Sequence, residues 1–151
     1  MAQVVIENPI LNAPFEEPQR YFRFAEDGIT DEIIQGRRSS SYFVPIPQPR
    51  KRGRQLAFSE WTEDRLKENE FINQVRERVA LWRKGGRVGM TRTTARLLEY
   101  WTRPERERRL FFCQIEAMET AIFLREVATR YGEAWLENKL VEANATSDAL
   151  L

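Results

Sequence analysis

Two basic runs in the first half of the chain have the residue types that contact nucleic acid. Two aromatic residues, Tyr42 and Phe43, lie between them. Basic side chains neutralise phosphates and an aromatic ring can stack on an unpaired base, so the runs could hold a DNA strand. A solvated loop of a highly charged protein is the favoured explanation of the runs, and contact with nucleic acid is the alternative. The predicted contact residues are Arg37, Arg38, Arg50, Lys51, Arg52 and Arg54.

A second basic cluster lies further along the chain, at Arg103, Arg106, Arg108 and Arg109. These arginines alternate with Glu105 and Glu107. If the segment is helical, pairing of opposite charges along one helix explains the cluster as well as contact with a ligand does.

The composition argues against several kinds of catalytic and metal site. The 151 residues include no histidine, which removes the commonest general base and any Ser-His-Asp arrangement. The one cysteine, Cys113, can form neither an internal disulfide nor a multi-cysteine zinc site, and we expect it to pack as a small apolar residue. We therefore predict no catalytic residue and no metal ligand.

The charge balance and the apolar runs bear on partners and location. The chain has 24 basic and 23 acidic residues, unlike a protein dedicated to coating nucleic acid. We find no signal peptide in the first 18 residues and no apolar run of membrane length. Together with the single cysteine, this favours a cytoplasmic protein that contacts no membrane.

Prolines and turn signals predict a sheet-rich region over residues 1–58. Strands are expected at 21–24, 29–34 and 41–46, with a turn at Glu26-Asp27-Gly28, giving a small antiparallel sheet or meander. The prolines forbid helix interiors here; they are Pro9, Pro14, Pro18, Pro45, Pro47 and Pro49.

Helical periodicity begins in the second half, over residues 59–144. Thr62 and the acids after it predict a helix start. Gly85-Gly86 would end that helix, and Thr91 or Thr93 would open a short second one. The expected apolar faces are Ile72, Val75, Val79 and Trp82 on the first helix, and Leu97, Leu98 and Trp101 on the second.

Two further helices are expected before the end of the chain. Pro104 would open a helix over 104–130 that Tyr131-Gly132 breaks. The last helix would contain Trp135, Leu136 and Leu140, followed by a frayed tail at 145–151. The aromatic residues expected in the core are Trp82, Trp101, Phe111 and Trp135. The predicted fold class is α+β, a small antiparallel sheet followed by three or four helices.

Five blocks of the sequence carry a resemblance to a known family. Residues 108–121 resemble the Q-motif helix of superfamily-two helicases, in which Gln-x-x-Ala precedes an apolar helix face. The other blocks are residues 5–12, 41–50, 61–65 and 81–86. Taken in their order along the chain, the five blocks resemble the leading region of DEAD/DEAH-box helicase proteins of the type III restriction endonuclease Res kind. The resemblance covers about Val4 to Asn144.

The resemblance implies an adenine-binding role for Gln114. In the family this glutamine pairs with the adenine edge of ATP, because its amide can donate and accept at once. Relatives often have an aromatic residue before it, where this chain has Cys113, so the stacking partner stays open between Phe112, Tyr100 and Trp101. One polar residue on an amphipathic helix is the alternative interpretation of Gln114.

The family's phosphate-binding loop, Gly-x-x-x-x-Gly-Lys-Ser/Thr, has no match here, nor does its acidic magnesium pair. The nuclease triplet Glu-x-Lys is matched only by Glu137-Asn138-Lys139, within a helical pattern and without a partner aspartate. A solvated helix face explains that triplet better. ATP and Mg are therefore expected for an intact family protein and not for this chain alone.

We thus expect a truncated N-terminal segment of a helicase-type restriction subunit, inactive alone and forming an incomplete part of a motor domain. Its partners by resemblance would be DNA and a modification (methyltransferase) subunit. Its uncovered apolar face would make the isolated chain poorly soluble or associating. The alternative is a stand-alone DNA- or protein-binding module without catalysis.

Overall fold

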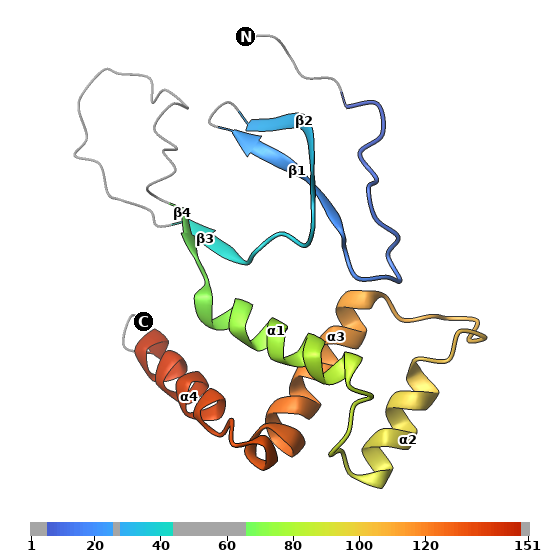
Figure 1. Ribbon diagram of the computed structural model, residues 1–151, viewed down its shortest axis with the longest axis vertical. Helices are drawn as coiled ribbons and strands as arrows, with labels where there is room; N and C mark the ends of the chain where they lie inside the picture. Colours follow the sequence, from blue (N-terminus) through green and yellow to red (C-terminus); the bar gives the residue numbers. More distant parts are fainter. Residues whose placement is uncertain (1–5, 26–27, 44–65, 149–151) are drawn as a thin grey trace. The chain divides into compact units, whose positions relative to one another are not determined.

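The computed structural model describes residues 6–25, 28–43 and 66–148 (Figure 1). Within these residues the fold is mixed α+β, with four α-helices and two small antiparallel sheets. The chain forms two compact units, Met1–Asn73 and Gln74–Leu151, and each is described by itself. The expected boundary at residues 58 and 59 lies outside the described residues. No helix in the described ranges is long and apolar enough to cross a membrane.

The first unit contains a β-hairpin of β1 (Arg20–Ala25) and β2 (Gly28–Gln35). Tyr21 pairs with Ile34 and Phe24 with Ile29, and the register shifts between Phe22 and Phe24. The first two predicted strands are thus confirmed. Asn12 holds the preceding segment against β1, because its Oδ1 accepts the N–H of Arg20 at 3.1 Å and its Nδ2 donates to the Arg20 carbonyl at 2.8 Å.

A second two-stranded sheet corrects the expected meander. β3 (Ser41–Phe43) pairs with β4 (Leu66–Glu68) and not with the hairpin. The prediction of helix from Thr62 onward is wrong over 66–69; residues 62–65 are not described. The helix starts later because Asn69 is its N-cap: the Asn69 Oδ1 accepts the N–H of Ile72 at 3.4 Å.

The apolar faces of the helices form the core of the second unit. α1 (Glu70–Lys84) begins in the first unit and buries Val75, Val79 and Trp82 in the second, as predicted. Trp82 stacks at a tilt on Phe123, with ring centroids 5.7 Å apart. α2 (Arg92–Trp101) follows, and Thr91 caps it as expected. The rest of the buried apolar core consists of Leu98, Val127, Ala128 and Leu136.

The helix expected over 104–130 is wrong in its first part. α3 covers Phe112–Ile122, and residues 103–111 form an irregular connection from α2. A helix there would place Arg103, Arg106 and Arg109 next to one another at three-residue intervals, and neighbouring like charges destabilise a helix. A π-helical turn, η3 (Phe123–Val127), and a 3-10 turn, η4 (Ala128–Tyr131), continue from α3. Gly132 ends them with φ +74°, at the predicted break.

The last helix, α4 (Trp135–Asp148), is longer than expected. It is helical through 145–148, where we predicted the frayed tail to begin. Three residues expected in the core are exposed instead: Leu97, Phe111 and Cys113. Phe111 precedes α3 with extended backbone, so it does not join that helix's apolar stripe. Leu97 lines a shallow surface depression.

Candidate nucleic-acid interface

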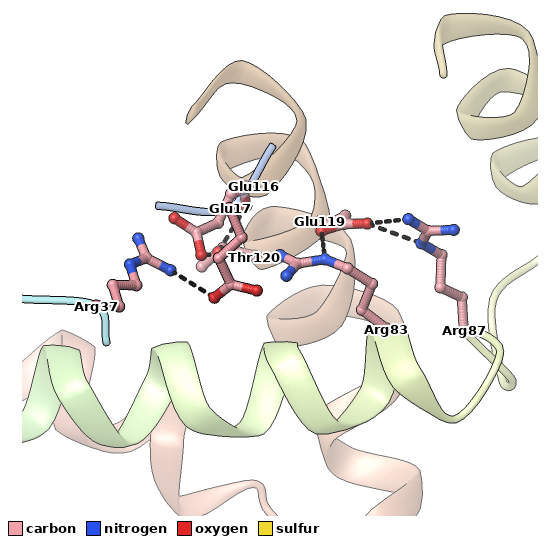
Figure 2. A network of polar contacts seen from close by, with 7 residues as sticks. All are labelled: Glu17, Arg37, Arg83, Arg87, Glu116, Glu119 and Thr120. Atoms are coloured by element: carbon pink, nitrogen blue, oxygen red, sulfur yellow. Dashed lines mark hydrogen bonds and ion pairs between the residues drawn. The ribbon is translucent and has the colours of Figure 1, made fainter. Parts of the chain in front are cut away.

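Two groups of arginine side chains in the second unit differ in their charge partners, and the first group pairs with carboxylates inside the protein. Glu119 of α3 is 0% exposed. Its Oε2 accepts from Arg83 Nε at 2.6 Å, and its Oε1 accepts from Arg87 Nε at 2.7 Å. Figure 2 shows both guanidiniums directed at this one carboxylate. A second carboxylate, Glu116, lies 3.7 Å from Arg83 Nη2. We call these four residues the Glu119 cluster.

The end of α1 places the two arginines of this cluster. Gly86 adopts φ +85°, and the next residue, Arg87, adopts φ +56°, which is uncommon for a residue with a Cβ. The Arg87 N–H donates to the Trp82 carbonyl at 3.0 Å and closes the helix end. The Arg83 guanidinium also lies 5.0 Å from the centre of the Phe112 ring. Strong charge pairing thus holds Arg87 in a strained backbone conformation.

The start of α2 is neutralised by another internal carboxylate, Glu126 in the π-helical turn. Its Oε2 accepts the N–H of Thr91 at 2.8 Å, and its Oε1 accepts from Thr94 Oγ1 at 2.6 Å. The N–H of Thr91, then the hydroxyl of Thr94, lower the pKa of Glu126. The positive end of the α2 dipole is therefore already matched by this protein's own carboxylate.

The second group of arginines lies along α2 and the connection that follows it. Residues 91–111 contain six arginines and three glutamates, so positive charge is concentrated in this segment of a nearly neutral chain. Arg96, Arg103 and Arg106 form no ion pair with any carboxylate in the described part of the chain. Because residues 103–111 are not helical, the intrahelical pairing considered for this cluster does not occur here.

Tyr100 is the centre of this second group. It is 51% exposed, and the guanidinium carbons of Arg106 and Arg103 lie 4.8 and 5.8 Å from its ring centre. One nitrogen of Arg106, Nη1, is covered and has no hydrogen-bond partner among the described residues. The ring contact is thus the interaction that holds this guanidinium. We call Arg96, Tyr100, Arg103 and Arg106 the arginine–tyrosine surface.

A shallow depression of about 350 Å³ follows the same face of α2. Arg96 lies four residues before Tyr100 on α2, Arg103 lies three residues after it just past the end of the helix, and all three line the depression. The other lining residues are Thr93, Leu97 and Glu99. Arginine, a hydroxyl and an exposed ring are groups that contact phosphates and bases, whereas Glu99 opposes an anion.

The four residues expected at an adenine do not line one depression. Gln114 is exposed at the start of α3, and its Oε1 accepts the N–H of Phe111 at 2.9 Å. This is the helix-start contact that glutamine makes at the third position of a helix. Phe112 lies under Arg83, and Trp101 is half-buried at the end of α2. Of the four, only Tyr100 lines the depression on α2.

Two of the basic residues predicted to contact nucleic acid, Arg37 and Arg38, lie in the described part of the first unit, and both already contact other side chains. Arg37 Nη1 lies 3.4 Å from Glu17 Oε1, and the Arg38 guanidinium lies 4.5 Å from the centre of the Phe24 ring. Arg38 and Phe24 line a shallow depression of about 260 Å³ that also includes Glu68. The second run, Arg50, Lys51, Arg52 and Arg54, lies outside the described residues.

The Glu-x-Lys triplet lies on the last helix. Glu137 and Lys139 are on α4, where Glu137 pairs with Arg125 and the Lys139 ammonium lies 5.1 Å from the Trp135 ring centre. This helical setting is the one expected for a solvated face. In the described ranges, no group of three or more Cys, Asp or Glu side chains could hold a metal ion.

Comparison with protein-family models, with curated proteins and with solved structures found no match.

Sequence reasoning missed the Glu119 cluster and the central role of Tyr100. Glu119 interrupts the apolar stripe of α3, between Ile115 and Ile122. A carboxylate at such a position signals a buried charge that needs a basic partner, so the pattern could have revealed it. For Tyr100, the four- and three-residue spacing of the arginines around it was the available signal.

Proposed function

We propose that this chain is a non-catalytic module that binds nucleic acid through the arginine–tyrosine surface. The observation that carries the proposal is a set of three guanidiniums around a half-exposed tyrosine, none of which pairs with a carboxylate in the part of the chain that the structure describes. It corresponds to the stand-alone alternative of the sequence interpretation, with the contact moved from the N-terminal basic runs to α2.

The contrast with the Glu119 cluster supports this choice. Arg83 and Arg87 are fixed by a buried carboxylate, so their donors are used within the fold. Arg96 and Arg103 have no such partner within residues 6–25, 28–43 and 66–148, and they line a depression open to solvent. A guanidinium presents several donors in a planar fork that matches phosphate oxygens, and each phosphate that it neutralises releases counterions. Nucleic acid supplies such phosphates at regular intervals.

The helicase-type assignment stays a separate prediction, supported by the resemblance alone. It includes the adenine role of Gln114, the ATP and Mg of an intact relative, and partnership with a modification subunit. Because the Gln114 oxygen already accepts a backbone N–H, one lone pair of that oxygen and the two N–H groups of the amide are left for an adenine. Titration of the wild type and Gln114→Ala with a fluorescent adenosine nucleotide tests it: equal binding would overturn the role.

The proposed function is tested by fluorescence anisotropy with labelled DNA. We expect the wild type to bind with an affinity that falls as salt rises. The double variant Arg96→Gln/Arg103→Gln should bind more weakly, with a log–log salt slope shallower by roughly 1 to 2. The matched control is Arg23→Gln/Arg125→Gln, which removes the same charge from two exposed arginines that are paired with Glu32 and Glu137.

Two results would overturn the proposal. One is equal weakening in the control, which would mean that binding follows net charge and not the arginine–tyrosine surface. The other is displacement of the DNA by poly-glutamate at matched charge concentration, which would assign the surface to acidic proteins.

A further inference from the structure

We infer that the arginine–tyrosine surface binds single-stranded nucleic acid, with one unpaired base stacked on Tyr100. This inference rests on the proposed function and specifies the ligand of the same surface. Its central observation is that the half-exposed ring of Tyr100 lines one depression together with Arg96 of α2 and Arg103 of the connection that follows α2.

The ring is what separates single strands from duplexes. In a duplex the flat faces of the bases are covered by their neighbours, and only their edges are open in the grooves. An exposed tyrosine ring can therefore stack only on a base that is unpaired and turned outward. A duplex would contact the arginines through its phosphates and leave Tyr100 without a role.

The order of residues along α2 fits one strand. Arg96 lies one helical turn before Tyr100 on α2, and Arg103 lies just past the end of α2, on the other side of Tyr100 in the sequence; all three line the depression. A base stacked on the ring has one phosphate on its 5′ side and one on its 3′ side, in the same strand. The two arginines are thus placed to meet the phosphates that flank that base.

A base can reach the Tyr100 ring if it displaces the Arg106 guanidinium. This guanidinium lies 4.8 Å from the Tyr100 ring centre and is tied to no carboxylate among the described residues. Displacing it breaks no ion pair. A base can therefore take its place on the ring, and the released guanidinium, including the Nη1 that now has no partner, becomes free to meet a phosphate oxygen.

The test compares three labelled ligands with the full chain: a thymidine strand of about 12 nucleotides, an abasic strand of equal length, and a duplex of equal length. The abasic strand keeps the phosphates of a single strand and removes the bases. We expect the wild type to bind the thymidine strand more tightly than the abasic strand. Tyr100→Ala should lose about fivefold to 100-fold affinity for the thymidine strand and little for the abasic one.

Tyr100→Phe is the conservative control, since it keeps the ring and should retain the preference for the thymidine strand. Circular dichroism would confirm that each variant is folded. Equal affinity of the wild type for the thymidine and abasic strands, or tighter binding of the duplex, would overturn the single-strand inference and leave the proposed function standing. Binding of none of the three ligands would overturn the proposed function itself.

Discussion

The two groups of arginines in the second unit differ in their surroundings: one group pairs with a buried carboxylate, and the other lies at the surface. In the Glu119 cluster, the guanidiniums of Arg83 and Arg87 meet at a carboxylate that no solvent reaches. At α2 and just after it, Arg96 and Arg103 lie beside the half-exposed Tyr100 ring in an open depression, and no carboxylate of the described residues pairs with them. The number of arginines alone does not separate the two groups. What separates them is whether a carboxylate of the same chain, such as Glu119, pairs with the guanidiniums.

The comparison also predicts where substitutions affect folding and where they affect binding. Removing the partner of a buried charge leaves that charge without compensation, so changes in the Glu119 cluster should lower stability. Changes of Arg96 and Arg103 remove exposed guanidiniums that form no ion pair among the described residues, so they should spare stability and act on the ligand.

The largest effect is expected for Glu119→Gln. The substitution keeps the shape of the side chain and removes the negative charge that both arginines share, and should lower the free energy of unfolding by about 3 kcal/mol. Urea denaturation followed by circular dichroism measures this change. The matched control is Glu99→Gln at the exposed end of α2, which should change stability little. A loss below about 1 kcal/mol would show that the cluster is not a source of stability.

Substitutions of Arg87 separate charge pairing from backbone strain. Both Arg87→Ala and Arg87→Gly remove the contact with Glu119, but only glycine adopts φ +56° without a steric cost. The glycine variant should therefore be more stable than the alanine variant by about 1 kcal/mol, and both less stable than the wild type. Thermal or urea unfolding of the three proteins gives the order. An alanine variant at least as stable as the glycine variant would contradict it.

Glu126→Gln should reveal a pH-dependent contact at the start of α2. The pKa of Glu126 is lowered in the folded protein, so the carboxylate stabilises the fold above its unfolded pKa. That contribution is lost as pH falls through the lower, folded pKa. At neutral pH the variant should be slightly less stable than the wild type, by less than about 1 kcal/mol, because solvent screens this partly exposed carboxylate. This difference should shrink in urea titrations taken below about pH 4. A difference that stays constant with pH would refute the contact.

The smallest effect is expected for Arg96→Gln and Arg103→Gln tested for stability. Neither guanidinium has an ion-pair partner among the described residues, so unfolding free energies should stay within about 0.5 kcal/mol of the wild type. Combined with loss of DNA binding, this result would sharpen the contrast between the two arginine groups. A loss above about 1 kcal/mol would mean that these arginines belong to the fold after all.

Local patterns in the sequence located much of the fold. The apolar spacing of Val75, Val79 and Trp82 predicted the buried face of α1, and Gly85-Gly86 predicted its end, because helix periodicity and glycine conformation are local properties. The start of α1 was misplaced because two candidate caps compete. Thr62 has the better sequence pattern, but Asn69 is the cap, and Asn73 of the same helix also binds the Ser40 backbone.

The candidate site could not be read from the sequence alone. Whether Arg103 and Arg106 pair with Glu105 and Glu107 depends on the backbone between them, and that backbone is irregular where a helix was expected. Likewise, the pairing of Arg83 and Arg87 with Glu119 joins residues more than thirty positions apart. Such contacts depend on how helices pack, which short sequence patterns do not encode.

The π-helical turn at Phe123–Val127 has a consequence for the ancestry of this chain. The Ala128 N–H reaches back to the Phe123 carbonyl, one residue further than in an α-helix, so the turn holds one additional amino acid. Deleting a single residue there would restore regular winding and rotate the preceding and following side chains by about 100° relative to each other. Glu126 would then leave the start of α2. Related sequences that keep the contact of the Glu126 carboxylate with Thr91 and Thr94 should therefore also keep the additional residue of the π-helical turn. Related sequences with a one-residue gap in this turn should lack that contact.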